Sequence, residues 1–295
     1  LTLKDEETDN LRFSFERLNS TNIEIMGHAR HYISVVQPTK TLTPNISEQS
    51  SIGEFFKSID NLIELNKNKY NKLINIKKSM LEKMFPKEGE YTPEIRFKGF
   101  TEPWKRCELG KLTDITKLAG FEFTKYITYS DVGKIIAIRG LNVKSGKLVL
   151  DDVKYIDNSD FTKLQRSKLY KDDILFTYVG TVGELAIITE NDKYYLAPNV
   201  SRIRIKNSLN ATFIAQFMRR EAFYNTTIFP LIATSSQPAL SMENIRKFIV
   251  SYPSIEEQIK IGEYFQNIDD LINLNQQKLE KLKNIKKSLL EKMFV

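Results

Sequence analysis

One long segment of this chain occurs twice, and that duplication limits the fold more than any other feature. Residues 52–86 and 261–295 align at a constant offset of 209 positions, and 23 of the 35 paired positions are identical. The offset is too large for a solenoid, whose repeats recur every ~20–50 residues. Two matching segments around an unlike stretch indicate a symmetric spacer that carries a variable module.

Both copies have the pattern of a long amphipathic helix. Capping boxes precede them at Asn45 with Glu48 and at Ser254 with Glu257, and heptad spacing follows. Because each helix alone would expose its apolar stripe, we expect the two to pair as an antiparallel coiled coil, with equivalent asparagines fixing the register. The residues predicted to form this seam, which also faces partners, are Ile59, Leu62, Asn66, Leu73, Ile76 and Met80 in the first copy and Ile268, Leu271, Asn275, Leu282, Ile285 and Leu289 in the second.

The stretch between the helices has the pattern of a mixed domain. Short β-rich runs are predicted at 134–139, 174–179, 184–189 and 200–206, and a helix at 211–226, with Ser241 capping another toward Arg246. The expected fold class is therefore α+β. The expected segments are an ill-defined start at 1–43, a spacer helix at 44–86, a linker at 87–103, the mixed domain at 104–252 and a second spacer helix at 253–295.

The net charge is +7, and most of the excess lies in the central module. Residues 86–250 carry 25 basic and 19 acidic side chains, a balance that fits a polyanionic partner. The single cysteine, Cys107, permits no disulfide within the chain and fits a reducing cytoplasm. No apolar run approaches the ~18 residues of a membrane-spanning helix, so we expect a cytoplasmic protein without a membrane partner.

The sequence offers no catalytic constellation and no metal or cofactor motif. Its two histidines, His28 and His31, are far from Cys107 and form no convincing metal site. The stretch 140–148 resembles a phosphate loop, but five residues separate its glycines and Leu148 stands where Ser or Thr is needed, which favours a strand turn. The acidic pair Asp172–Asp173 is interpreted as a solvated turn.

Several motifs, taken in order, resemble the specificity subunit of Type I restriction–modification systems. They are PEIRFKGF at 93–100, Trp104, Leu109–Gly110, GTVG at 180–183, QPALS at 237–241, PSIEEQ at 253–258, and helices ending KKS[M/L]LEKMF. Each motif alone is weak, but together they cover residues 44–295. In that family two target-recognition domains each read half of a split DNA site, and helices set their separation and dock two methyltransferase subunits.

The resemblance implies that residues 104–252 form one complete target-recognition domain. It implies a non-catalytic subunit that binds double-stranded DNA, methyltransferase subunits and, through the complex, restriction subunits, without a cofactor. Base and phosphate contacts require Arg, Lys, Asn, Gln, Ser, Thr and Tyr side chains on loops. The residues of these types that we expect to contact DNA are Arg139, Asn142, Lys144, Lys147, Tyr178, Thr181, Asn199, Arg202, Ser235, Ser236 and Gln237.

Two other function classes fit parts of the sequence. A coiled-coil scaffold without a DNA role explains the helices but not the basic module, and a DNA-cleaving enzyme needs an acidic site that the motifs do not reveal. Residues 1–43 are too short for a second recognition domain and correspond at most to the tail of one. Two arrangements therefore remain open, a half-subunit that forms a homodimer on a palindromic site, or part of a longer subunit with an asymmetric site.

Overall fold

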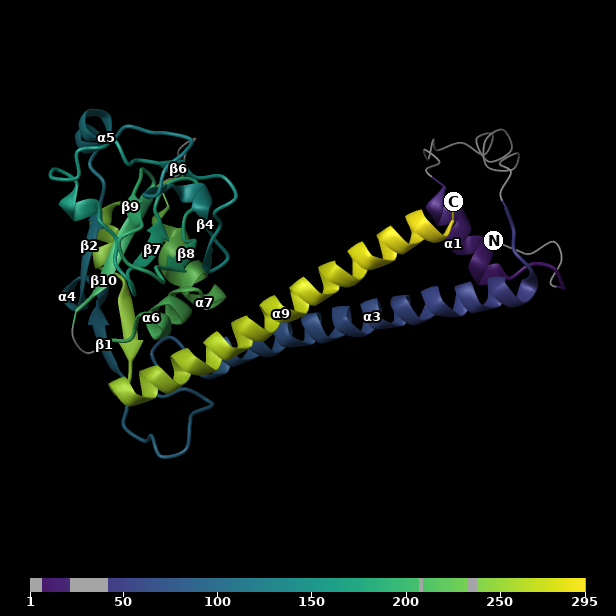
Figure 1. The fold of residues 1–295 in the computed structure, drawn as a ribbon. Coiled ribbons are helices and arrows are strands. Elements are labelled where there is room, and N and C mark those ends of the chain that lie inside the picture. Colours follow the sequence, from purple (N-terminus) through teal and green to yellow (C-terminus); the bar gives the residue numbers. More distant parts are fainter. Residues whose placement is uncertain (1–6, 22–41, 207–208, 233–237, 295) are drawn as a thin grey trace. The chain divides into compact units, whose positions relative to one another are not determined.

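The computed structural model describes residues 7–21, 42–206, 209–232 and 238–294 (Figure 1). The chain divides into two compact units, Leu1–Asn75 with Asp269–Val295, and Ile76–Ile268. Two long helices contribute to both, α3 (Ile46–Lys83) and α9 (Ile255–Met293), and they match the two predicted spacer helices. Their predicted caps are present, since the Asn45 side chain accepts from Glu48 N at 2.9 Å and Ser254 Oγ accepts from Glu257 N at 3.5 Å.

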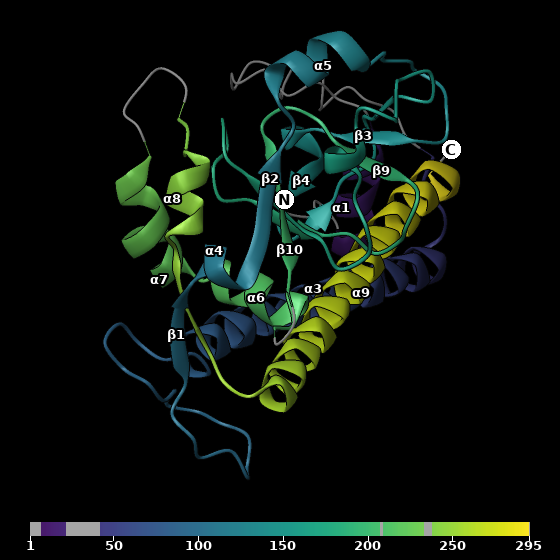
Figure 2. The same ribbon diagram turned by 90° about the vertical axis from the view of Figure 1, so that its left-hand side faces the viewer.

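The second unit contains several small sheets. The largest has four antiparallel strands in the order β2-β10-β7-β8, and Figure 2 shows β2 beside β10. A three-stranded sheet has the order β6-β3-β9, in which β3 and β9 are parallel, while β1 pairs with β11 and β4 with β5. The strands are β1 (Lys105–Glu108), β2 (Thr113–Lys117), β3 (Ile136–Ile138), β4 (Val143–Lys144), β5 (Lys147–Leu148), β6 (Lys154–Tyr155), β7 (Ile174–Thr177), β8 (Leu185–Ile187), β9 (Tyr194–Leu196), β10 (Val200–Ile205) and β11 (Ile249–Tyr252).

Short helices connect these strands. Ser241 caps the last of them as predicted, because its Oγ accepts from Asn244 N at 3.0 Å. The predicted helix at 211–226 ends earlier, at Met218, and a short helix and a π-helical turn at Tyr224–Ile228 follow it. The helices are α4 (Leu109–Leu112), α5 (Gly120–Tyr126), α6 (Ala211–Met218), α7 (Glu221–Phe223) and α8 (Met242–Arg246). The predicted α+β class with two long helices is confirmed.

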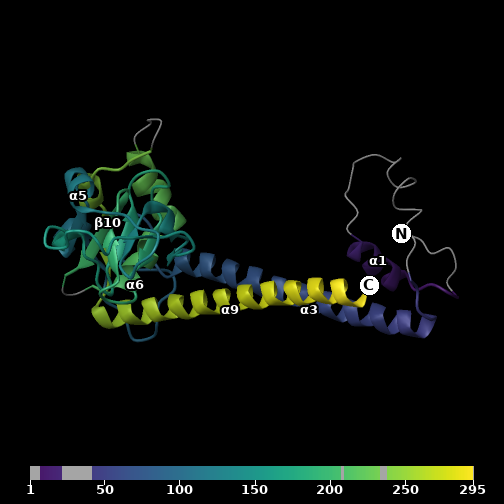
Figure 3. The same ribbon diagram turned by 45° about the horizontal axis from the view of Figure 1, so that its top comes forward.

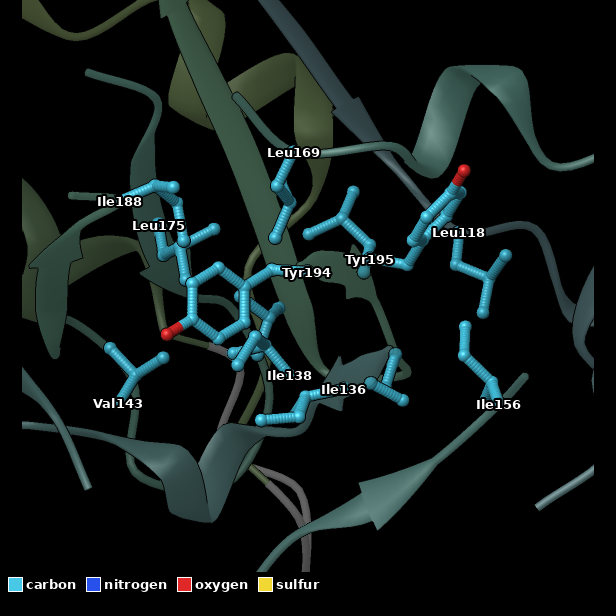
Figure 4. Close-up of a cluster of buried hydrophobic side chains, with 14 of the residues drawn as sticks. Leu118, Ile136, Ile138, Val143, Ile156, Leu169, Leu175, Ile188, Tyr194 and Tyr195 are labelled. Atoms are coloured by element: carbon cyan, nitrogen blue, oxygen red, sulfur yellow. The ribbon is translucent and has the colours of Figure 1, made fainter. Parts of the chain in front are cut away.

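A buried apolar cluster joins the four-stranded and three-stranded sheets (Figure 4). Ile138 and Leu196, from β3 and β9, and Leu175 from β7 are all fully buried in it. Tyr194 and Tyr195 lie in the same cluster and add ring area. Since a buried aliphatic side chain contributes about 1.5–3 kcal/mol, this cluster fixes the sheets that support the loops described below.

An aromatic joint anchors the second unit to the ends of its two long helices. Phe85, just after α3, packs against Trp104, Phe213 of α6 and Phe265 of α9, with ring centroids 5.4–5.9 Å apart. All four rings are at most 1% exposed. Within this unit α3 ends where α9 begins, so the two helices run antiparallel.

A pair of polar side chains locks the same joint. Asn210 caps α6 by accepting from Phe213 N at 2.9 Å, and its own N–H donates to Gln258 Oε1 at 2.9 Å. Gln258 in turn donates from Nε2 to Pro253 O at 2.9 Å. The joint therefore satisfies the backbone groups at the start of both α6 and α9.

The first unit repeats this joint with different residues. Asn10 caps α1 (Leu11–Ser20) by accepting from Phe13 N at 3.0 Å, and its N–H donates to Gln49 Oε1 at 2.9 Å. Gln49 donates from Nε2 to Pro44 O at 2.9 Å. The helix α1 thus occupies the position in this unit that α6 occupies in the other, a correspondence that the sequence analysis missed.

The first unit also repeats the aromatic contacts that the second unit makes in its joint. Phe294 contacts Phe13 and Phe56 with centroids 5.3 and 5.7 Å apart, and Phe294 is the sequence equivalent of Phe85. Lys286 Nζ lies 2.8 Å from Asp60 Oδ1. Because 56 contacts 294 while 60 contacts 286, the helices also run antiparallel in this unit (Figure 3).

The predicted seam is only partly correct. Ile59, Ile268 and the two asparagines Asn66 and Asn275 are buried, and Leu73, Met80, Leu282 and Leu289 are half-buried. Each asparagine donates to the carbonyl four residues earlier on its own helix. Four of the predicted residues are 36–48% exposed and are not covered by the helix pair itself, namely Leu62, Ile76, Leu271 and Ile285. Each helix carries more apolar surface than one neighbouring helix covers.

Candidate nucleic-acid interface

Three tight turns of the second unit surround one cleft of about 580 Å³. The β4–β5 turn contains Ser145 with φ 52° and Gly146 with φ 84°, and the β7–β8 turn contains Gly180 and Gly183 with φ 80° and 97°. Asn199, just before β10, has φ 73°. Left-handed backbone makes these turns compact, so polar groups from distant parts of the sequence meet around a single hollow.

Four of the residues predicted to contact DNA line this cleft, Arg139, Lys144, Thr181 and Asn199. Lys144 and Asn199 are exposed, while the Arg139 side chain is 21% exposed. Arg139 Nη2 donates to the main-chain O and to Oδ1 of Asp152, both at 2.8 Å. Its Nε is buried and has no hydrogen-bond partner among the described residues.

The GTVG motif is tied to the QPALS motif at the cleft. Gly180 N donates to Pro238 O at 2.9 Å, and Leu240 N donates to Tyr178 O at 2.8 Å. The remaining predicted contacts at Ser235, Ser236 and Gln237 lie outside the described residues. Lys147 is exposed on β5, the strand that follows the first turn.

Asn142 is placed where it cannot contact a ligand. The side chain is fully buried, accepts from Arg139 N at 3.1 Å, and donates to the main-chain oxygens of Val149 and Asp152 at 2.9 and 2.7 Å. Its amide therefore organises the loop between β3 and β4. We correct its predicted role from DNA contact to loop support.

Arg202 is likewise part of the protein interior. Its side chain is 5% exposed, forms an ion pair with Asp114 on β2, and donates to Arg166 O at 3.0 Å. Burial lowers the pKa of Arg202, and the neighbouring Arg204 lowers it further. Asp173, interpreted from sequence as solvated, is 2% exposed and receives two 2.7 Å hydrogen bonds from Arg204. Both arginines therefore hold the sheet together.

Tyr178 is only 9% exposed, and burial raises its pKa. Its ring carries the Lys117 ammonium 5.0 Å from the centroid. The cleft residues that the sequence analysis missed include Tyr129, Leu141 and Glu184. Tyr129 and Leu141 are 38% and 53% exposed. The local sequence signal for this part of the cleft was a leucine between Gly140 and Asn142.

The described residues hold no group of three or more His, Cys, Asp or Glu side chains that would bind a metal ion. Across the same described ranges, no helix has the length and apolarity needed to cross a bilayer. The cleft lining combines apolar side chains such as Leu141 and Val179 with polar and basic ones such as Arg139 and Lys144, which can bind a ligand through hydrogen bonds and charge.

The family model for the Type I restriction modification DNA specificity domain matches residues 101–284. The chain belongs to this family. The matched range contains the cleft, three of the four rings of the aromatic joint (Trp104, Phe213 and Phe265) and most of α9. The resemblance predicted from the sequence motifs is thus confirmed.

The chain is similar to curated specificity subunits over much of its length. The chain is 22% identical over 265 residues to the Type I restriction enzyme MjaVIII specificity subunit of Methanocaldococcus jannaschii, covering 87% of this chain and 61% of that protein. It is 25% identical over 161 residues to the EcoBI specificity subunit of Escherichia coli, covering 53% of this chain and 34% of that one. The chain therefore spans less than two thirds of the length of these curated relatives.

Solved structures share the fold. The HsdS subunit from Thermoanaerobacter tengcongensis aligns over 98% of this chain and 70% of its own, with a TM-score of 0.55 and 14% identity. The S subunit from M. genitalium aligns over 100% and 75%, with a TM-score of 0.54 and 16% identity. These likenesses show that the chain shares its fold, long helices included, with those structures.

Proposed function

We propose that this chain is a non-catalytic DNA-recognition subunit of a Type I restriction–modification complex in the cytoplasm, and that residues 104–252 read one half of a split DNA target. The observation that carries the proposal is the cleft, because it gathers Arg139, Lys144, Thr181 and Asn199 from separate segments within the family's specificity domain. Arg and Asn read base edges, while Lys and Thr contact phosphates.

The decisive test is DNA selection by the complex assembled from the full chain and its methyltransferase subunits. A duplex library with randomised positions is bound, and the retained DNA is sequenced. The expected result is a split consensus, one half of ~3–5 base pairs being specified by this domain, with affinity that falls steeply as salt rises. A retained pool with the composition of the input would refute the proposal.

The methyltransferase subunits are proposed to dock on apolar side chains that the helices leave uncovered. In the first unit Leu62 and Leu65 of α3 are 48% and 65% exposed, and their repeat equivalents Leu271 and Leu274 of α9 are 45% and 62% exposed. Isolated exposed leucines are common, but two sequence-equivalent pairs offer the same surface twice. Two copies of one partner therefore fit such a spacer.

A second recognition domain is proposed to belong beside α1. The support is the repeated joint, in which Asn10, Gln49 and Phe13 make the contacts that Asn210, Gln258 and Phe213 make at the end of the described recognition domain. That domain is supplied either by the same polypeptide or by a second copy of this chain. Light scattering combined with methylation mapping separates these cases, since a homodimer requires a palindromic target and a monomer an asymmetric one.

A further inference from the structure

Among the residues that line the cleft, Glu184 is the acidic one. It lies there together with Arg139 and Lys144 and is half-buried. Several acids elsewhere in the same unit pair with cations, as in Arg139–Asp152 and Lys168–Asp192. Within the described part of the chain, no lysine or arginine pairs with the Glu184 carboxylate.

The protein holds this carboxylate in a fixed position. Its backbone N donates to Thr177 Oγ1 at 2.9 Å, and its carbonyl accepts from Thr177 N at 3.0 Å. The carboxylate Oε2 accepts from Ser145 N at 2.5 Å, which ties the β7–β8 turn to the β4–β5 turn. Gly183 before it has φ 97° and lies against Tyr224, whose ring an added Cβ would meet at 3.0 Å, so this turn favours glycine there.

We infer that Glu184 is a specificity-determining residue that accepts a hydrogen bond from the 4-amino group of a cytosine in the major groove. This inference rests on the proposed DNA-recognition function. A carboxylate in a surface that faces a polyanion repels phosphate, so it favours binding only where a base donates to it. Cytosine offers an amino donor without an adjacent acceptor, whereas adenine places the N7 lone pair next to its amino group.

The Glu184→Gln change separates this role from simple support of the turn. A glutamine amide oxygen still accepts from Ser145 N, so the fold is retained. Its amide now both donates and accepts, which matches adenine N7 and N6 instead of cytosine. Glu243→Gln is the control, because it removes the same charge from an exposed glutamate of the same unit that pairs with Lys247.

The experiment is selection from a randomised duplex library by the complex containing the full chain, in its unaltered form and with Glu184→Gln, Glu184→Ala or Glu243→Gln. At one base pair, Glu184→Gln is expected to change the selection from cytosine to adenine by about tenfold, the effect of one good base contact. Glu184→Ala removes selection at that pair alone, and Glu243→Gln leaves the consensus unchanged. Melting temperatures verify that every variant is folded.

Two other outcomes separate failure of this inference from failure of the proposed function. If both Glu184 variants keep the original consensus, or change affinity evenly for every sequence, Glu184 does not read a base and this inference is refuted while the proposed function stands. If the unaltered complex selects no sequence at all, the proposed function fails and the inference fails with it.

Discussion

Replacing Arg96 with methionine is expected to destabilise the second unit strongly. Arg96 lies in the linker between α3 and the recognition domain, and its Nε and Nη2 donate to Glu257 Oε1 and Oε2 at 2.7 and 2.8 Å. The Glu257 side chain is completely buried and that of Arg96 is 14% exposed. Arg96→Met therefore leaves an unpaired charge in the interior, a change that costs about 3–5 kcal/mol.

The magnitude can be measured by thermal unfolding of the full chain. For a unit of this size about 1 kcal/mol corresponds to roughly 2–4 °C, so Arg96→Met is expected to lower Tm by roughly 6–20 °C. The matched control is Lys83→Met, because the Lys83–Glu94 pair has both side chains 42–53% exposed and contributes only about 0–1 kcal/mol. Adding Glu257→Gln to Arg96→Met should recover part of the loss. Equal Tm values for the Arg96 and Lys83 variants would refute the reasoning.

Four further changes test other parts of the structure. Lys144→Ala should weaken DNA binding evenly across sequences and reduce the salt slope by about 1 in electrophoretic shifts of the complex. Asn142→Ala should lower Tm, because Arg139 N and Val149 O lose their hydrogen bonds to the Asn142 side chain at about 1 kcal/mol each, while Asp152 O keeps Arg139 Nη2, and DNA binding should decline only with unfolding. Leu274→Glu should leave Tm unchanged but abolish copurification with methyltransferase. Burial raises the pKa of Asp60, but hydrogen bonds from its cationic neighbours, Lys286 included, outweigh it and hold that pKa below its ordinary value. The resulting stability is complete above pH ~4 and is lost as pH falls through the lower folded-state pKa, and Lys286→Met should flatten this acid limb of the unfolding curve.

The long helices and the strands β3, β7, β8 and β10 were predictable because periodicity reports which face of an element is buried. The same periodicity does not say what covers that face. Leu62 and Leu271 fit the heptad as well as Ile59 does, yet only Ile59 is covered by the chain itself. The heptad pattern does not show which of the apolar residues the partner helix covers and which stay exposed. The seam was therefore predicted only in part.

Side-chain roles at the cleft were less predictable, since an arginine or asparagine in a loop or strand can serve a ligand or the protein. Arg202 could be recognised as internal only by knowing that β10 pairs with β2, which sets it opposite Thr116 and near Asp114. That pairing joins residues almost ninety positions apart. The α1 joint left a weaker signal, an Asn-x-x-Phe at both Asn10 and Asn210, because the two lie at different distances from their glutamine partners.

The motifs that revealed the family belong mostly to the joint of the second unit rather than to the cleft. Arg96 and Trp104 tie the linker to α9 and the aromatic cluster, and Gln258 clamps the start of α6. Gly110 fits because an added Cβ would come within 2.8 Å of Arg246. These contacts fix the position of the mixed domain on the ends of its own helices. The tips of the three cleft turns take no part in them. Under the proposed function, a change beside one of these turns, as at Lys144, therefore alters which DNA is bound without altering the support beneath it.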